Sequence, residues 1–575
     1  MIGKPPNVPR DAESVMELTR LGAIWPTKFS FSHNFIRHIA KIGFHCEIAE
    51  KTLDDEGRGR IVYRVHVADE TLTFVAFSDP LPEDQQQDRI IATRWDAWAA
   101  LFVGVPSEED LATSRVEIQK VIWGRAAPGT ITWSRANRSA RLFEHVIDSL
   151  ANGRQPDAAQ LNQVGYLIRT TGFSGNGRNG MHDYAYLRSI DHPLKAPYHA
   201  QMMAGYLWRE FGFDLATHLA KVRNPDAIEL SDDIRRFIGI GNSSGIGLVP
   251  FVVRHPRLLH RWIEVREKAL SEFAAQTFDA EAPECGKFEA LLERARRYIR
   301  HEPRGELDEF ASGDCIAQDI EIASRTFARL REEWNENLES GSNPVSATIS
   351  AVSRQIAAES LEFLNALALE IHEDGAVDPD VMHADETLSF PPDGTTGELL
   401  ALIQEHFRWT ERFAAKGSRP FFWYSSEENM EPRRGARGVD EGEEYQLPVD
   451  ILGRLEELIA ALQASPGDEL LGRFLVRYPD MRFMVAWTFT LANADYSIAR
   501  MDLLSEDFSP LKIMRFQLAT YGMLKFRPRS KTWLRATIFQ GAPLPGELSA
   551  GSIGDGLLPE IPGSGELDPD NVIGE

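Results

Sequence analysis

The sequence predicts a mainly α-helical fold: a large helical assembly with a small N-terminal β-hairpin element, α+β overall. Two observations favour this class. Apolar residues recur at three- and four-residue intervals through most of the 575 residues, and the clearest β-hairpin pattern lies near the N-terminus. The apolar content of 43% and the charged content of 26% are typical of a globular protein, so this pattern belongs to a chain that folds.

The N-terminal part contains both kinds of element. Apolar residues at helical spacing predict a helix between Phe29 and Ile48. Residues 61–67 and 71–77 are rich in β-branched and aromatic side chains around a short polar turn, and they predict the hairpin. A kinase-like small lobe would need a phosphate-gripping lysine on such a strand, but residues 75–78 read Val-Ala-Phe-Ser, which excludes that interpretation.

Helical spacing dominates the rest of the chain. Trp95, Trp98, Ala99 and Phe102 fall on one helical stripe, so helices are expected from Arg89 to about residue 150. Further helices are expected over 196–222, from Pro256, and from 396 to 415, and residues 531–539 predict a strand. Changes in composition divide the chain into six expected regions: a polar lead-in (1–28), an N-terminal α+β region (29–150), a glycine-loop helical core (151–275), an acidic helical region (276–400), a C-terminal helical region with an aromatic and basic loop (401–545), and a disordered acidic tail (546–575).

Charge and cysteine content exclude several classes of protein. A formal charge of −24 argues against binding to nucleic acid or to an anionic membrane, because the average field of the protein repels both. The three cysteines are far apart and odd in number, which predicts no disulfide framework. Neither a signal peptide nor a run of about 20 apolar residues is found, so the sequence predicts a soluble cytoplasmic protein.

Two glycine-rich stretches, residues 170–183 and 239–250, are the strongest candidates for a functional site. Each contains too many glycines for the interior of a helix or strand, because glycine costs about 0.5–1 kcal/mol there relative to alanine. Both are therefore expected to be loops at helix ends. A glycine loop before a helix offers free backbone N–H groups to an anion, and Asn242, Ser243 and Ser244 would add side-chain donors. A tight helix-to-helix turn is the alternative, since neither dinucleotide nor phosphate-loop spacing is present.

The first stretch also holds groups suited to acid–base chemistry. His182 titrates near neutral pH in ordinary surroundings, Asp183 could orient it, and Asn176 and Arg178 could bind an anion. These residues predict proton transfer by His182 and Asp183. The alternative is a capping or surface role, because adjacent residues on a helix do not face each other.

A second candidate lies in the C-terminal region. Aromatic residues ending at Tyr424 precede the basic pair Arg433 and Arg434, and together they could form a wall and a clamp for a small anion. Equally, the aromatic run could fill a core and the basic run could be a solvated face. Clustered Cys and His spacing and the HExxH motif are absent, so we expect no metal and no cofactor.

The Ser243-Ser244-Gly245 tripeptide followed by Leu248-Val249-Pro250 resembles the aromatic amino acid ammonia-lyase family. In that family an Xaa-Ser-Gly tripeptide cyclises into an electrophilic prosthetic group, and a nearby Leu-Ala-Pro follows. Thr171-Gly172-Phe173 is similar to its Thr-Gly-Phe-Gly. The resemblance implies a large helical enzyme that eliminates ammonia, with Ser244 at the centre of the precursor. After the tripeptide, Ile246-Gly247 departs from the Gly-Asp of that family.

These features together predict an enzyme that acts on a small anionic metabolite, a carboxylate or a phosphate. Lyase-type proton abstraction suits the parts, because it needs a base and oxyanion donors but no cofactor. The competing interpretation is a non-catalytic helical binding or scaffold protein. A small anionic substrate is the expected partner, nucleic acid and membrane are not, and self-association into a homo-oligomer is left open.

Overall fold

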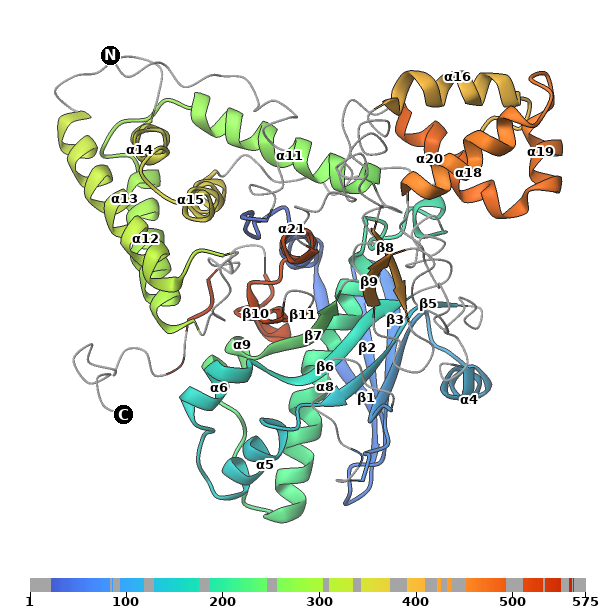
Figure 1. The fold of residues 1–575 in the computed structure, drawn as a ribbon. Helices are drawn as coiled ribbons and strands as arrows, with labels where there is room; N and C mark the ends of the chain where they lie inside the picture. Colours follow the sequence, from blue (N-terminus) through green and yellow to red (C-terminus); the bar gives the residue numbers. More distant parts are fainter. Residues whose placement is uncertain are drawn as a thin grey trace.

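The computed structural model is built around one large β-sheet. It describes residues 22–82, 85, 94–117, 129–174, 186–245, 256–302, 310–334, 343–372, 390–408, 421–425, 432–436, 451–492, 510–530, 533–549, 558–560 and 562. The sheet has nine strands in the order β1-β2-β3-β4-β5-β6-β7-β11-β10 (Figure 1). The strands are β1 (Phe44–Leu53), β2 (Gly59–Val67), β3 (Glu70–Ser78), β4 (Ala97–Val103), β5 (Thr130–Arg138), β6 (Tyr166–Ser174), β7 (Gly239–Gly245), β10 (Lys525–Ser530) and β11 (Trp533–Ile538).

This sheet shows that the predicted fold class, mainly α with a small hairpin, is wrong. The predicted hairpin is confirmed as β2 and β3, but it is one part of a sheet that extends to β10. The predicted helix across Trp98 and Phe102 is instead β4. Strand β4 is buried on both faces, so its apolar residues form a continuous run instead of alternating with polar ones. Such a run cannot be told from a buried helix by periodicity alone.

Strand β7 corrects a second expectation, because residues 239–245 of the second glycine-rich stretch form a strand inside the sheet and not a loop. Residues 170–174 of the first stretch likewise belong to β6, and the rest of both stretches lies outside the described residues. Glycine is needed in β7 for close packing. A Cβ on Gly241 would lie 2.6 Å from the Cγ atom of Tyr166, and a Cβ on Gly239 would overlap the carbonyl oxygen of Ile538. The missing side chains let neighbouring groups approach the strand backbone, which offsets the usual cost of glycine in a strand.

Helix α8 (His199–Arg223) is the central helix of the molecule and confirms the helix predicted over 196–222. It is buried along most of its length and packs against one face of β3 to β7. Trp208 donates its indole N–H to Ser134 of β5, and a Cβ on Gly212 would lie 3.0 Å from Ile168 of β6. The small helix α4 (Glu108–Glu117) covers the other face, where Leu111 shares a core with residues of β2 to β5.

Two groups of helices flank the sheet, at the upper left and upper right of Figure 1. The left group shares a second hydrophobic core. The predicted helix from Pro256 is confirmed as α11 (Pro256–Ala275), which Figure 1 shows running from the left group towards the right group. The left group contains α12 (Pro283–His301), α13 (Gly313–Trp334), α14 (Pro344–Val352) and α15 (Ala358–Ile371), and the right group contains α16 (Thr396–His406), α18 (Ile451–Gln463), α19 (Leu471–Arg477), η5 (Pro479–Met481) and α20 (Arg482–Ala492).

The remaining elements complete the cores and the edges. The strand predicted near the C-terminus is confirmed as β11. A separate two-stranded sheet joins β8 and β9. These elements are α3 (Phe31–Ile42), α5 (Phe143–Ala151), α6 (Ala158–Val164), α9 (Asp232–Phe237), β8 (Phe421–Ser425), β9 (Pro432–Ala436), α21 (Pro510–Tyr521) and η7 (Pro545–Glu547).

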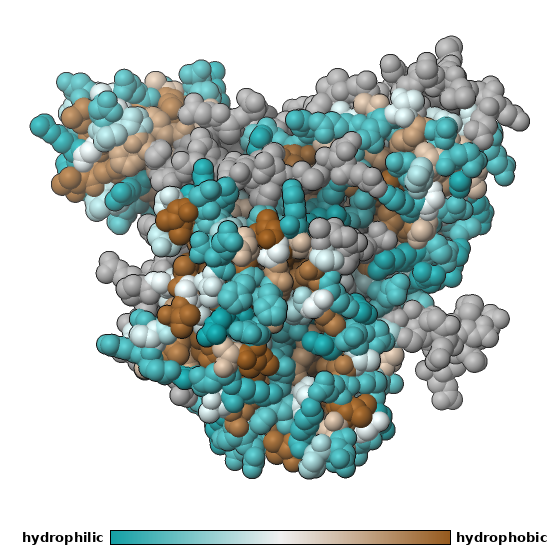
Figure 2. All heavy atoms as spheres, turned by 180° about the vertical axis from the view of Figure 1, so that it is seen from behind, coloured by the Kyte–Doolittle hydropathy of each residue, from teal (hydrophilic) through white to brown (hydrophobic). Residues whose placement is uncertain are grey.

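Parts of the expected acidic tail are packed against the rest of the chain. Glu547 forms an ion pair with Arg236 of α9, and Leu558 is fully buried in the core of the left helical group. On the surface seen from behind, apolar side chains are scattered among hydrophilic ones (Figure 2). Within the described ranges, no helix has the length and apolar character needed to cross a membrane.

Candidate anion site at the carboxyl edge of strands β6 and β7

Strands β6 and β7 are parallel, whereas the other neighbouring pairs described in the large sheet are antiparallel. Both strands therefore end at the same edge. The chain continues from Ser174 into the rest of the first glycine-rich stretch and from Gly245 into the rest of the second. The sheet thus brings the starting points of both stretches to one edge.

Helix α8 approaches the same edge with its amino end. Trp208 contacts Ser134, whose partner on β6 is Phe173, whereas the more C-terminal Gly212 approaches Ile168. Helix α8 therefore runs opposite to β6, and its amino end at His199 lies towards the carboxyl edge of the strand. The positive end of the helix dipole favours negative charge there.

The predicted residues of the two stretches differ in how far the structure describes them. Asn176, Arg178, His182 and Asp183 lie outside the described residues. Asn242 is buried on β7 and is the register partner of Thr170 on β6.

The two serines of the second stretch, Ser243 and Ser244, lie within strand β7. Ser243 pairs in register with Arg535 and Ser244 with Leu534, both on β11. This extended geometry disfavours the prosthetic group of the ammonia-lyase resemblance. Cyclisation requires the nitrogen of Gly245 to reach the carbonyl carbon of Ser243, and an extended strand holds these two atoms apart.

The aromatic and basic runs of the C-terminal region come together as an antiparallel pair. Tyr424 on β8 is the register partner of Arg433 on β9, and Trp423 is the partner of Arg434. The sequence proposed that these two runs act as a unit, and the pairing places them side by side. Among the described strands, they form a sheet of their own, separate from the large sheet.

Arginines from three strands share the sheet face opposite α8. Arg135 of β5 is the register partner of Trp98, which belongs to the core on that face. Arg169 of β6 is buried, with 4% of its surface exposed, and Arg535 of β11 is 7% exposed. The register places both on the face opposite α8. Arg169 pairs with Asn137, which lies two residues after Arg135 and therefore on the same face, and it also pairs with Gly241 of β7. Arg535 pairs with Ser243, two residues after Gly241 and therefore on that face as well.

Two donors on β5 lack acceptors among the described residues. The guanidinium of Arg135 lies 4.7 Å from the ring centroid of Trp95, and it has neither a hydrogen bond nor a carboxylate partner there. Burial lowers the pKa of Arg135, the direction expected when a cation is desolvated without compensation. The indole N–H of Trp133 is also buried without an acceptor. Asp96, the carboxylate nearest in register, is engaged by the backbone N–H groups of Leu81 and Arg138.

Sequence reasoning missed Trp133 and Arg135. The alternation of side-chain character over residues 130–138 would have indicated a strand where helices were expected, but it could not have shown that the cation lacks a partner. Whether an arginine on a strand has a partner is a property of the tertiary structure. Buried polar groups are almost always hydrogen-bonded, so the buried indole N–H of Trp133, two residues from the half-buried Arg135, requires an explanation.

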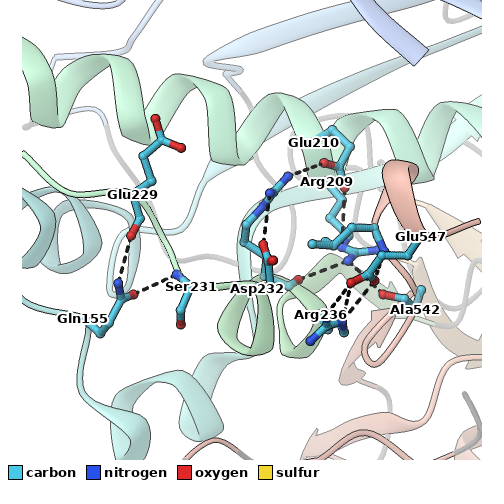
Figure 3. Close-up of polar contacts among 11 residues, drawn as sticks. Gln155, Arg209, Glu210, Glu229, Ser231, Asp232, Arg236, Ala542 and Glu547 are labelled. Carbon is cyan, nitrogen blue, oxygen red and sulfur yellow. Dashed lines mark hydrogen bonds and ion pairs between the residues drawn. The ribbon is translucent and has the colours of Figure 1, made fainter. Parts of the chain in front are cut away.

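A different polar network occupies the opposite, amino edge of β7 (Figure 3). Arg209 of α8 donates hydrogen bonds to the carbonyl oxygens of Arg235, Ala542 and Pro543, over 3.1, 2.9 and 3.3 Å. Glu210 accepts from Arg235 over 3.1 Å, and Arg236 pairs with Glu547. This network ties α8, α9 and the C-terminal segment together, so we assign it a structural role.

Two carboxylates of α8 at this edge, Glu210 and Asp214, are desolvated by burial. Burial raises the pKa of Glu210, although Arg209 and Arg235 oppose the shift. Burial also raises the pKa of Asp214, one helical turn later, although the hydroxyl of Tyr63 donates to this carboxylate over 2.6 Å. Both carboxylates are held in place by hydrogen bonds and desolvated, but they lie away from the carboxyl edge of β6 and β7.

Metal coordination finds no support in the described part of the chain, where no group of three His, Cys, Asp or Glu side chains could hold an ion. Comparisons with protein families, curated proteins and solved structures found no match to this chain. The function is therefore inferred from the geometry of the chain itself.

Proposed function

We propose that the protein is an enzyme that acts on a small anionic metabolite at the shared carboxyl edge of β6 and β7. The observation that carries this proposal is the parallel pairing of the two strands, from which both glycine-rich stretches continue. Backbone N–H groups of the glycine-rich stretches, the amino end of α8 and the arginines of the adjacent face all favour a negatively charged ligand.

Proton transfer is the reaction that these parts support. His182 follows β6 closely in sequence and would accept a proton, while the oxyanion donors would stabilise the charge that develops on a substrate carboxylate. This chemistry needs no cofactor. The proposed reaction class is cofactor-independent acid–base catalysis, with abstraction of a proton beside a carboxylate as the first candidate.

A ligand screen followed by proton exchange tests this function. The full chain is screened by thermal shift against carboxylates, amino acids and phosphates, since a ligand at 100 times its Kd stabilises by about 2.7 kcal/mol. Each stabilising acid is then incubated with the protein in D₂O. Proton NMR measures the loss of the signal from the proton on the carbon next to the carboxylate. We expect the wild-type protein to catalyse this proton exchange. His182→Ala should abolish the exchange, whereas His45→Ala, a control at an exposed position of β1, should retain it.

The outcomes separate the two classes of function. Exchange that is equally fast in His182→Ala would contradict the assigned base. Binding without exchange for every stabilising acid would identify a non-catalytic binding protein. If no anion stabilises the folded protein, the proposal fails altogether.

A further inference from the structure

The two acceptorless donors on β5 lie next to each other on one face of the sheet. Trp133 and Arg135 are two residues apart, so their Cα atoms are about 7 Å apart and their side chains point to the same face. Both groups can donate hydrogen bonds, and neither the indole nor the guanidinium can accept one. Whatever binds between them must therefore supply acceptor oxygens.

The register places this pair at the carboxyl edge of β6. Trp133 is the partner of Ser174, the last residue of β6. The β5–β6 pairing is irregular between Ser134 and Ala136, so an extra residue of β6 stands opposite Arg135. Such bulges redirect side chains and are frequent beside active sites. Arg135 is only partly buried, which leaves a route for a ligand.

The number of donors favours a ligand with several acceptor oxygens. The indole of Trp133 offers one N–H group, and the guanidinium of Arg135 offers five. A phosphate carries about −1.5 to −2 at neutral pH and offers three acceptor oxygens, whereas a carboxylate carries −1 and offers two.

We propose that Trp133 and Arg135 form a phosphate subsite, so that the metabolite bound at the carboxyl edge carries a phosphate group. This inference rests on the proposed function and narrows its ligand class. The indole N–H and the guanidinium N–H groups bind the phosphate oxygens, while the ring of Trp95 holds the guanidinium in place.

Calorimetric titration of the full chain with inorganic pyrophosphate, orthophosphate and malonate tests the subsite. Wild-type protein is expected to bind pyrophosphate more tightly than malonate. Because each side chain donates hydrogen bonds to a charged ligand, Arg135→Gln and Trp133→Phe should each weaken pyrophosphate binding on the order of tenfold or more. The phenylalanine retains an aromatic ring but removes the N–H. Arg154→Gln, at an exposed position, should leave binding unchanged.

Circular dichroism and thermal unfolding establish that each variant is folded before its affinity is interpreted. Unchanged pyrophosphate binding in both folded variants would overturn the subsite, as would wild-type protein that binds malonate but neither phosphate. In the malonate case the proposed function would stand and only the phosphate assignment would fail. Conversely, phosphate binding that depends on Arg135 but is unaffected by His182→Ala, with no proton exchange, would support the subsite and contradict the proposed catalysis.

Discussion

The two edges of β7 use arginine in opposite ways. At the amino edge, Arg209 is 2% exposed, yet its guanidinium donates to three backbone carbonyl groups, and Arg236 pairs with Glu547. At the carboxyl edge that β7 shares with β6, the half-buried Arg135 of β5 rests on Trp95 and has no carboxylate partner among the described residues. A desolvated charge with partners is part of the scaffold, whereas one without partners costs stability unless a ligand or solvent compensates it. The contrast between the edges separates structural arginines from candidate binding arginines.

The largest expected effect is the loss of the amino-edge network. Replacing Arg209 by methionine would remove a donor from the carbonyl oxygens of Arg235 and Ala542 and leave Glu210 with one fewer cation, while Pro543 would keep the hydrogen bond from the Tyr206 hydroxyl. We expect Arg209→Met to lower the free energy of unfolding by about 3 kcal/mol, measured by urea denaturation. The exposed control Arg154→Met should change it by less than about 0.5 kcal/mol. If Arg209→Met lowers the free energy of unfolding by less than about 1 kcal/mol, the structural role assigned to Arg209 is wrong.

The pH dependence of Asp214 sharpens the description of the same edge. Because burial raises its pKa, the folded chain holds this proton more strongly than the unfolded chain does. The stability from this group is full below the unfolded pKa of about 4 and is lost as the pH rises through the higher folded value. Asp214→Asn removes the titration and can still accept the hydrogen bond from Tyr63.

The stability of Asp214→Asn relative to wild type should therefore increase as the pH rises from 4 to 8. Urea denaturation at both pH values measures this difference. Asp226→Asn, at an exposed position, provides the control. A difference that stays constant with pH, or that decreases, would show that Asp214 is not desolvated in the folded protein.

A smaller effect is expected at the surface of the network. Arg236 and Glu547 expose 43% and 31% of their side chains, so solvent screens their ion pair. We expect Glu547→Gln to lower the free energy of unfolding by about 1 kcal/mol or less. A loss above about 2 kcal/mol would mean that the C-terminal segment depends on this one pair.

The smallest expected effect on stability concerns Arg135. Arg135→Gln removes the contact with Trp95, worth about 0.5–2 kcal/mol, but also removes an uncompensated cation from a half-buried position. These changes oppose each other, so we expect the free energy of unfolding without ligand to change by less than about 1 kcal/mol. A loss as large as that of Arg209→Met would show that Arg135 is structural and would end the contrast between the two edges.

The sequence predicted those elements whose pattern is local. Helices α8 and α11 and the β2–β3 hairpin follow from apolar spacing and turn residues within one short window. The rest of the sheet could not be predicted in this way. Strand β4 is buried on both faces, and β7 is completed by β11, which lies far along the chain. The glycines of β7 predicted a loop, because the neighbouring groups that pack against them in the sheet are not visible in the sequence.

The candidate site was predictable only in part. The two glycine-rich stretches stand out by composition, whereas their meeting at one edge depends on the parallel pairing of β6 and β7. Trp133 and Arg135 carry no sequence motif. Their significance comes from the partners that they lack, which is a property of the folded chain.

The central claim, that one ligand engages both glycine-rich stretches, is tested most directly by hydrogen–deuterium exchange of the full chain with and without inorganic pyrophosphate. We predict that the ligand slows exchange in peptides covering residues 170–185 and in peptides covering 239–255, while peptides around η7 at the amino edge remain unchanged. Protection of only one stretch, or protection confined to the amino edge, would contradict a shared site at the carboxyl ends of β6 and β7.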